Sequence, residues 1–197
     1  MSSRKRWHLI FVMEENKTTK ICSFFGAEAL PYLYDGFNLQ VCSAIMGSFE
    51  DGCHTFYFGG QGEFEAICHR IVTAIKEGHA PYISVDRIFC VKEEEQLQAQ
   101  RRDSVPERYE DVVYLSPSPT QKQNSSYARN CAMIDASDTV IFCVEEKGNS
   151  SASRAYKYAQ MKGKKIVNLW EKYAPVLVPR DVARHLLNRR EGVFSVD

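Results

Sequence analysis

The chain has 197 residues, 44% of them hydrophobic and 12% aromatic, which is enough to bury one substantial core, so we expect a single domain over residues 1–197. Its 25 basic residues balance 25 acidic ones, so no overall field attracts nucleic acid or a membrane, and a local site must supply any affinity for an anion. The seven cysteines include no C-x-x-C pair and are expected to be small buried residues in a reducing cytoplasm.

Residues 1–19 are predicted to form an N-terminal arm or an edge strand. They hold a basic start and the apolar run WHLIFVM at residues 7–13. A membrane span needs roughly 20 apolar residues, and a signal peptide needs a longer apolar core with a small-residue cleavage site. We therefore expect a cytoplasmic protein with no membrane association.

Strands and helices are predicted to alternate along the first half of the chain. A buried strand over residues 20–25 stops at Gly26, and apolar residues spaced about four apart predict a helix within residues 32–49. Residues 55–58 form the next predicted strand. A further strand is predicted within residues 81–91 and is centred on residues 88–91.

The second half continues this alternation. Strands are predicted over residues 109–116, 138–144 and 165–170, and helices over residues 126–134, from Ser151 or Ser153 to Lys162, and over 179–190 within a C-terminal helical extension at 171–197. Strands that alternate with helices of about ten residues predict an α/β fold, a Rossmann-like three-layer sandwich with a mainly parallel sheet.

A glycine-rich turn joins the strand at residues 55–58 to a helix. This turn contains Gly59, Gly60 and Gly62. Backbone N–H groups at such a helix start can converge on an anion, which suggests a phosphate or nucleotide site. The alternative is that the turn is an ordinary connection between a strand and a helix, as found in any α/β protein, and binds no ligand. Neither G-x-G-x-x-G nor G-K-[ST] is present, so ATP hydrolysis is not expected.

Three segments resemble the SLOG superfamily, most closely its YpsA-like branch, which is related to DprA and to the LOG (lysine-decarboxylase-like) proteins. They are KICSFFG at 20–26, FYFGGQGEFE at 56–65 and the block at 126–169. In the last block an Arg-Asn pair, a Met three residues later, an aspartate-led strand and a small-residue helix start occur at the family's spacing. The resemblance implies a Rossmann-like sheet that binds nucleotide-derived small molecules at the carboxyl ends of its strands.

The chain departs from the YpsA-like pattern at two places. Residues 26–28 are Gly-Ala-Glu where the branch usually has Gly-His-Arg, and residues 148–153 are GNSSAS where it usually has a Gly-Gly turn. Serine hydroxyls can still donate to a phosphate, so binding can survive the second change. A bond-cleaving arrangement is less well supported.

The predicted ligand-binding residues lie where strands end and helices begin. They are Gly26, Gly59, Gly60, Gly62, Glu65, Arg129, Asn130, Gly148, Ser150 and Ser151. By the resemblance, Glu65 accepts hydrogen bonds from a ribose, and a phosphate lies near Arg129 and residues 148–153. The simpler alternatives are that Glu63 and Glu65 only favour the helix dipole and that Arg129 is a solvated helix position.

Two Cys-His pairs resemble metal ligands only superficially. His69 is predicted to lie on a different side of its helix from Cys68, and no further ligands occur at zinc-site spacing. No metal and no cofactor are therefore expected. Tyr57 and Phe58, at the end of a strand, could stack on a base, although core packing is the commoner role of such residues.

These features favour a module that binds a nucleotide-derived small molecule as a sensor or sequestering protein in bacterial or phage biology, and that forms a homo-oligomer. One alternative is a nucleoside 5'-monophosphate phosphoribohydrolase, which cleaves an N-glycosidic bond with Glu65 as the catalytic group. Another is a protein-interaction module in which residues 7–13 pair with the strand edge of another chain.

Overall fold

The computed structural model describes residues 19–28, 30, 36–79, 84–94, 96–97, 108–117 and 126–170. The strands are β1 (Lys20–Gly26), β2 (Cys53–Phe58), β3 (Asp86–Val91), β4 (Asp111–Tyr114), β5 (Thr139–Cys143) and β6 (Lys165–Asn168). The helices in these ranges are α2 (Phe37–Glu50), α3 (Gly62–His79), α5 (Ser126–Ala136) and α6 (Ser151–Met161).

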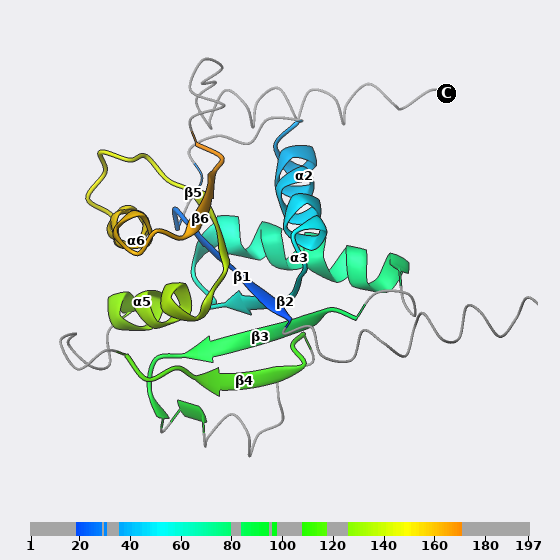
Figure 1. The fold of residues 1–197 in the computed structure, drawn as a ribbon, viewed down its shortest axis with the longest axis horizontal. Coiled ribbons are helices and arrows are strands. Elements are labelled where there is room, and N and C mark those ends of the chain that lie inside the picture. Colours follow the sequence, from blue (N-terminus) through cyan, green and yellow to red (C-terminus); the bar gives the residue numbers. More distant parts are fainter. Residues whose placement is uncertain are drawn as a thin grey trace, which may run out of the picture.

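The strands form one sheet in the order β4-β3-β2-β1-β5-β6, and every neighbouring pair is parallel. From β1 the chain steps outward through β2, β3 and β4, and it then returns to the other side of β1 to add β5 and β6 (Figure 1). The strand order therefore reverses between β1 and β5. Ligands of open α/β sheets bind outside the carboxyl ends of the strands at such a reversal.

Two layers of helices enclose the sheet. Helices α2 and α3 pack together over one face, and α5 and α6 pack together over the other (Figure 1). The period-two alternation of β1 sends Phe24 to the first core, where it stacks on Phe56 and Phe58, and Phe25 to the second, beside Phe142. This confirms the predicted α/β fold, a Rossmann-like three-layer sandwich, with a fully parallel sheet in the described residues.

Some predicted boundaries differ from the observed ones. The helix predicted within residues 32–49 is observed from Phe37, with Gly36 at its N-cap position. Strand β4 covers four residues of the predicted range 109–116. Of the predicted arm at 1–19, residues 1–18 lie outside the described residues. The predicted extension at 171–197, with its helix at 179–190, also lies outside them.

All seven cysteines are free thiols, and all except the half-buried Cys42 are buried, as predicted. Burial raises the pKa of the Cys143 thiol to about 12, which keeps it protonated at neutral pH. None of the described helices is both long and apolar enough to span a bilayer.

Candidate functional site at the carboxyl edge of the sheet

Glu65 closes the glycine-rich turn that follows β2. Its Oε1 accepts a hydrogen bond from the Gly60 N–H at 2.5 Å, and its Oε2 accepts one from the Gln61 N–H at 3.2 Å. Positive φ angles of 70° at Gly60 and 81° at Gly62 allow the chain to turn this tightly. The N–H groups that could have received a phosphate are therefore already bound to a carboxylate from the first turn of α3.

The Glu65 side chain is only 5% exposed. Burial raises its pKa, and this effect is opposed by the N–H groups of Gly60 and Gln61 and by the nearby Arg129. Both of its carboxylate oxygens are thus occupied within the protein. Its predicted contact with a ribose stays a prediction.

Arg129 reaches the same turn from the opposite layer of helices. Its Nη1 donates to the Gly59 carbonyl at 2.5 Å, and its Nη2 donates to Oδ1 of Asn130 at 3.2 Å. The side chain is 4% exposed, so the alternative of a solvated helix position is wrong. A methyl group at Gly59 would lie 2.6 Å from Cζ of Arg129, so glycine is required here for the guanidinium to pack against the backbone.

One N–H group of the Arg129 guanidinium makes no hydrogen bond within the part of the chain that the structure describes. Its buried Nε has no hydrogen-bond partner among the described residues. Burial lowers the pKa of Arg129, and the charge of Glu65 acts in the other direction. Because an arginine stays protonated in proteins, this buried N–H is a donor that the described residues leave unsatisfied.

A pocket of about 380 Å³ opens beside this guanidinium, at the carboxyl ends of β2 and β3. Its lining residues are Gly59, Phe89, Cys90, Val91, Lys92, Gln96 and Arg129. Gln96 is held at its rim, where its Oε1 accepts a hydrogen bond from the Lys92 N–H at 3.3 Å. The pocket is therefore lined by two cationic side chains, Arg129 and Lys92, and by the aromatic ring of Phe89.

Sequence reasoning missed Phe89, Lys92 and Gln96. The signal for Lys92 was present, because it directly follows a buried strand and the carboxyl ends of parallel strands share one edge. The position of Gln96 depends on the path of the chain after β3, which the residue pattern does not specify.

The space beside Gly26 and the space beside Gly62 are filled by other atoms of the protein. A methyl group at Gly26 would lie 2.5 Å from the Phe64 side chain, and one at Gly62 would lie 2.7 Å from Cα of Glu28. Glu63 strengthens the same contact, because its N–H donates to the Glu28 carbonyl at 2.9 Å. These glycines bring the segment after β1 against the start of α3.

Glu63 does more than favour the helix dipole. Its Oε2 accepts a hydrogen bond from the Leu30 N–H at 3.0 Å, so its carboxylate anchors the segment that follows β1. The structure thus separates the two glutamates, with Glu65 holding the turn after β2 and Glu63 the segment after β1.

The segment after β5 makes its own hydrogen bonds. Ser150 caps α6, with its Oγ accepting from the Ser153 N–H at 3.0 Å, and Ser153 Oγ donates to the Glu145 carbonyl at 3.1 Å. Ser153 Oγ also lies 2.6 Å from the position of a methyl group at Gly148. Ser151 has a buried Oγ without a partner among the described residues. A phosphate in this segment stays a prediction.

The other candidates have structural partners. His69 Nε2 lies 2.9 Å from the Arg108 carbonyl, and its ring packs against Phe58 and Tyr109. Phe58 is buried in the core, so core packing rather than base stacking is its role. Among the described residues, no group of three or more His, Cys, Asp or Glu side chains is placed to hold a metal ion.

Comparisons with known proteins give little information about the function of this site. No protein-family model and no curated protein matches the chain. Among solved structures, the X-ray structure of the structural-genomics target TM1055 is similar, with 10% sequence identity, coverage of 86% of this chain and 99% of that one, and a TM-score of 0.46. The fold therefore rests on the strand order and helix layers of the chain itself.

Proposed function

We propose that the chain binds a phosphate-bearing, nucleotide-derived small molecule at the carboxyl edge of its sheet and acts as a sensor or sequestering protein without cleaving it. The proposal places the anion on Arg129 and Lys92, in the pocket between the ends of β2 and β3. It includes membership of the SLOG superfamily, in its YpsA-like branch, on the resemblance of the segments at 20–26, 56–65 and 126–169.

The observation that carries the proposal is the buried Arg129 guanidinium with its unpaired Nε beside a pocket. A guanidinium offers a planar pair of donors that suits phosphate. Lys92 supplies a second positive charge at the pocket, and the pocket volume of about 380 Å³ lies within the range of small-molecule sites.

Binding without cleavage is favoured by the state of Glu65. A phosphoribohydrolase needs a carboxyl group within reach of the reacting sugar. Both oxygens of Glu65 accept backbone hydrogen bonds and the side chain is buried. The Glu65 carboxylate is therefore a positioning group that holds the turn on which Arg129 rests.

The local charges favour a phosphate near Arg129 over one after β5, although the strand order reverses between β1 and β5. Glu145 and Glu146 flank the segment after β5, and the hydroxyls of Ser150 and Ser153 are bound to each other at 2.8 Å. An anion there would meet two carboxylates and displace existing hydrogen bonds. Near Arg129 it would meet two cations, Arg129 and Lys92, and none of the described residues that line the pocket there carries a carboxylate.

A thermal-shift screen over inorganic phosphate, nucleoside mono- and diphosphates and cyclic dinucleotides tests the proposal. A ligand at 100 times its Kd stabilises by about 2.7 kcal/mol, which raises the melting temperature by roughly 5 to 10 °C for a domain of this size. We expect such a shift with at least one nucleotide. No shift with any of them, together with no nucleotide copurifying by mass spectrometry, would contradict the proposal.

Two variants locate the anion. Arg129→Gln and Lys92→Gln are each expected to weaken binding by about tenfold or more, since a charged hydrogen bond contributes roughly 1.5 to 3 kcal/mol. The control is Arg70→Gln, a change of the same type at an exposed position of α3. Equal affinity in all three variants would rule out this pocket as the site of the anion. Chromatography of nucleoside monophosphates after incubation tests cleavage, and release of free base above that of a sample without protein would favour the phosphoribohydrolase.

A further inference from the structure

An aromatic ring forms part of the wall of the pocket beside Arg129. Phe89, in β3, lines this pocket and is half-buried. Two contacts hold its ring: the ring centroid of Tyr109 lies 5.2 Å away, and a methyl group at Gly60 would lie 2.8 Å from Cε2 of Phe89. A ring that is held in place and still reaches a pocket suits a nucleobase, because every base has a π-face that stacks on aromatic side chains.

The amide group of Gln96 has a fixed orientation at the rim of the same pocket. Its Oε1 accepts a hydrogen bond from the Lys92 N–H at 3.3 Å. Because a backbone N–H can only donate, the oxygen and not the NH₂ group of the amide faces it. None of the described residues accepts a hydrogen bond from the NH₂ group. The NH₂ group is therefore the end of Gln96 that is available to a ligand.

The polar side chains that line the pocket all offer donors to a ligand. They are the Nε–H of Arg129, the ammonium group of Lys92 and the NH₂ group of Gln96. The carbonyl of Gly59, another lining residue, already accepts from Arg129. No side-chain carboxylate or hydroxyl occurs among the described lining residues. A matching ligand therefore presents acceptors both at its charged end and at the edge that meets Gln96.

Nucleobases differ in the acceptors that one edge presents. Guanine and hypoxanthine carry the acceptors O6 and N7 side by side, whereas adenine carries N7 beside the donor N6 and cytosine presents the donor N4. Glutamine commonly binds adenine through both ends of its amide, with the oxygen accepting from N6. In this pocket that oxygen is engaged by the Lys92 N–H. The NH₂ group of Gln96 therefore matches the O6 and N7 edge of a 6-oxopurine better than the edge of adenine.

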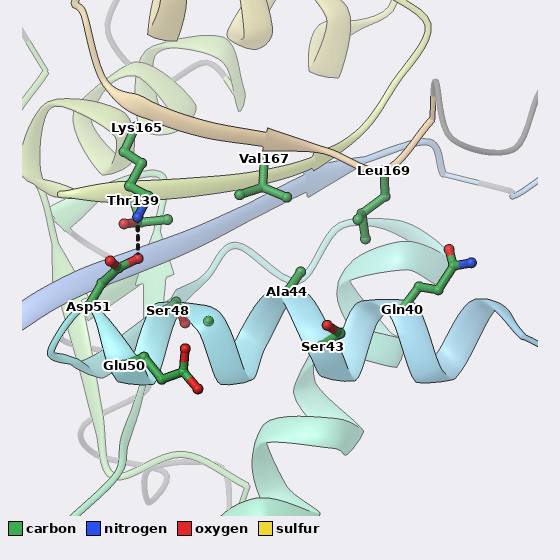
Figure 2. A pocket seen from close by; sticks show the side chains of 11 residues that line it. Gln40, Ser43, Ala44, Ser48, Glu50, Asp51, Thr139, Lys165, Val167 and Leu169 are labelled. Carbon is green, nitrogen blue, oxygen red and sulfur yellow. Dashed lines mark hydrogen bonds and ion pairs between the residues drawn. The ribbon is translucent and has the colours of Figure 1, made fainter.

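The pocket between α2 and β6 lacks this combination of groups. It encloses about 640 Å³, and Glu50, Asp51 and Lys165 are among its lining residues. Figure 2 shows Lys165 and Asp51 joined as an ion pair, with Glu50 near the same end of α2. Two carboxylates beside a neutralised lysine disfavour a phosphate, and no aromatic ring occurs among the described residues of the lining. The nucleotide is therefore assigned to the pocket beside Arg129.

Resting on the function proposed above, we propose that the ligand is a 6-oxopurine mononucleotide. Its phosphate lies on Arg129 and Lys92, its base stacks on Phe89, and its O6 and N7 edge accepts from the NH₂ group of Gln96. The pocket volume of about 380 Å³ is near the lower end of the range of small-molecule sites, which suits a mononucleotide better than a dinucleotide. Gln96 is then the residue that determines base specificity.

Calorimetric titration of the full chain with four probes tests this proposal. They are guanosine, inosine and adenosine 5'-monophosphate, and ribose 5-phosphate, which has no base. The guanosine and inosine nucleotides are expected to bind about tenfold or more tightly than the adenosine nucleotide. Ribose 5-phosphate is expected to bind about tenfold or more weakly than the guanosine nucleotide, because it cannot stack. Inosine lacks the 2-amino group of guanosine, so similar affinities for these two nucleotides would locate the contact on the O6 and N7 edge.

Two variants assign the contacts to residues. Gln96→Met keeps the length of the side chain and removes the donor, so the preference for guanosine over adenosine is expected to fall from about tenfold to about one. The control is Gln160→Met, the same change at an exposed position of α6. Phe89→Leu is expected to weaken all three nucleotides about tenfold and to leave ribose 5-phosphate at its wild-type affinity. Thermal melting of each variant checks that it remains folded.

The outcomes separate this proposal from the function on which it rests. If no probe binds, both are wrong. If ribose 5-phosphate binds as tightly as every nucleotide, the anion site stands and the base contact is wrong. Equal affinity for adenosine and guanosine, a preference for guanosine that inosine does not share, or a guanosine preference that persists in Gln96→Met would each contradict the role of Gln96.

Discussion

Glu65 and Arg129 hold the same turn, residues 59–61, from opposite layers of the fold. Glu65 in α3 accepts the N–H groups of Gly60 and Gln61, and Arg129 in α5 donates to the carbonyl of Gly59. The backbone at the carboxyl end of β2 is thus fixed by an anion from one layer and a cation from the other. A change at either side chain is expected to alter the position of the other.

Replacing Glu65 by Gln tests its role in holding the turn. Glutamine has one acceptor oxygen, so its NH₂ group would face a backbone N–H, and the unpaired donor is expected to cost about 1 to 3 kcal/mol in the free energy of unfolding. Urea denaturation measures the loss. The control is Glu77→Gln, at an exposed position of the same helix, and an equal effect of both changes would contradict the assignment.

Gly59→Ala tests the packing of the guanidinium. The new methyl group would lie 2.6 Å from Cζ of Arg129, so the side chain must move and lose its bond to the Gly59 carbonyl. We expect nucleotide affinity to fall about tenfold or more, since each 1.4 kcal/mol is a factor of ten. Calorimetric titration with the ligand found in the screen measures it. Gly47→Ala is the control, because apart from its chain neighbours and the backbone of its own helix nothing lies within 4 Å of a methyl group there.

The fold was predictable because its signals are local. Strand β5 is a run of five buried residues, and α6 begins at a serine cap, which are patterns that neighbouring residues create. The register of the apolar residues on α3 likewise indicated which side faces the core. Such local patterns determine the type and order of the elements, and therefore the parallel sheet.

The site was less predictable because its contacts are distant or depend on dihedral angles. Arg129 and Gly59 are 70 positions apart, and the burial of Arg129 follows from the packing of α5 on the sheet. The contact of Glu65 with Gly60 requires positive φ angles in the turn between them. A residue pattern identifies the glycines but not whether a ligand or the protein fills the space beside them.

The stability of the β3–β4 edge is expected to depend on pH through Glu110. Burial alone would raise the pKa of this carboxyl group, but hydrogen bonds from Arg87 and Lys76 outweigh burial and lower the pKa to about 2 from its ordinary value of 4.5. A lowered folded-state pKa contributes stability that is present above pH 4.5 and is lost as the pH falls toward 2.

Chemical denaturation between pH 6 and pH 2 measures this contribution. The difference in unfolding free energy between wild type and Glu110→Gln is expected to shrink as the pH falls, with the partial exposure of Glu110 limiting its size. Asp86→Asn is the control, since Asp86 is exposed at the start of β3. A difference that stays constant over this range would contradict the role of Glu110.

Gly26 provides the last prediction, because it separates a packing role from a ligand-binding role. A methyl group there would lie 2.5 Å from Cβ and 2.6 Å from Cγ of Phe64, which is fully buried and cannot swing away. Gly26→Ala is therefore expected to destabilise by about 1 to 3 kcal/mol through overpacking. Phe64→Ala removes Cγ and the ring, two of the three close contacts, and leaves room for the remaining Cβ to shift. The two changes are therefore expected to couple by about 0.5 to 3 kcal/mol in a double-mutant denaturation cycle, with the double variant more stable than the two single losses predict. If Gly26 instead admits a ligand, Gly26→Ala would reduce nucleotide affinity without loss of stability, and the cycle would show no coupling to Phe64.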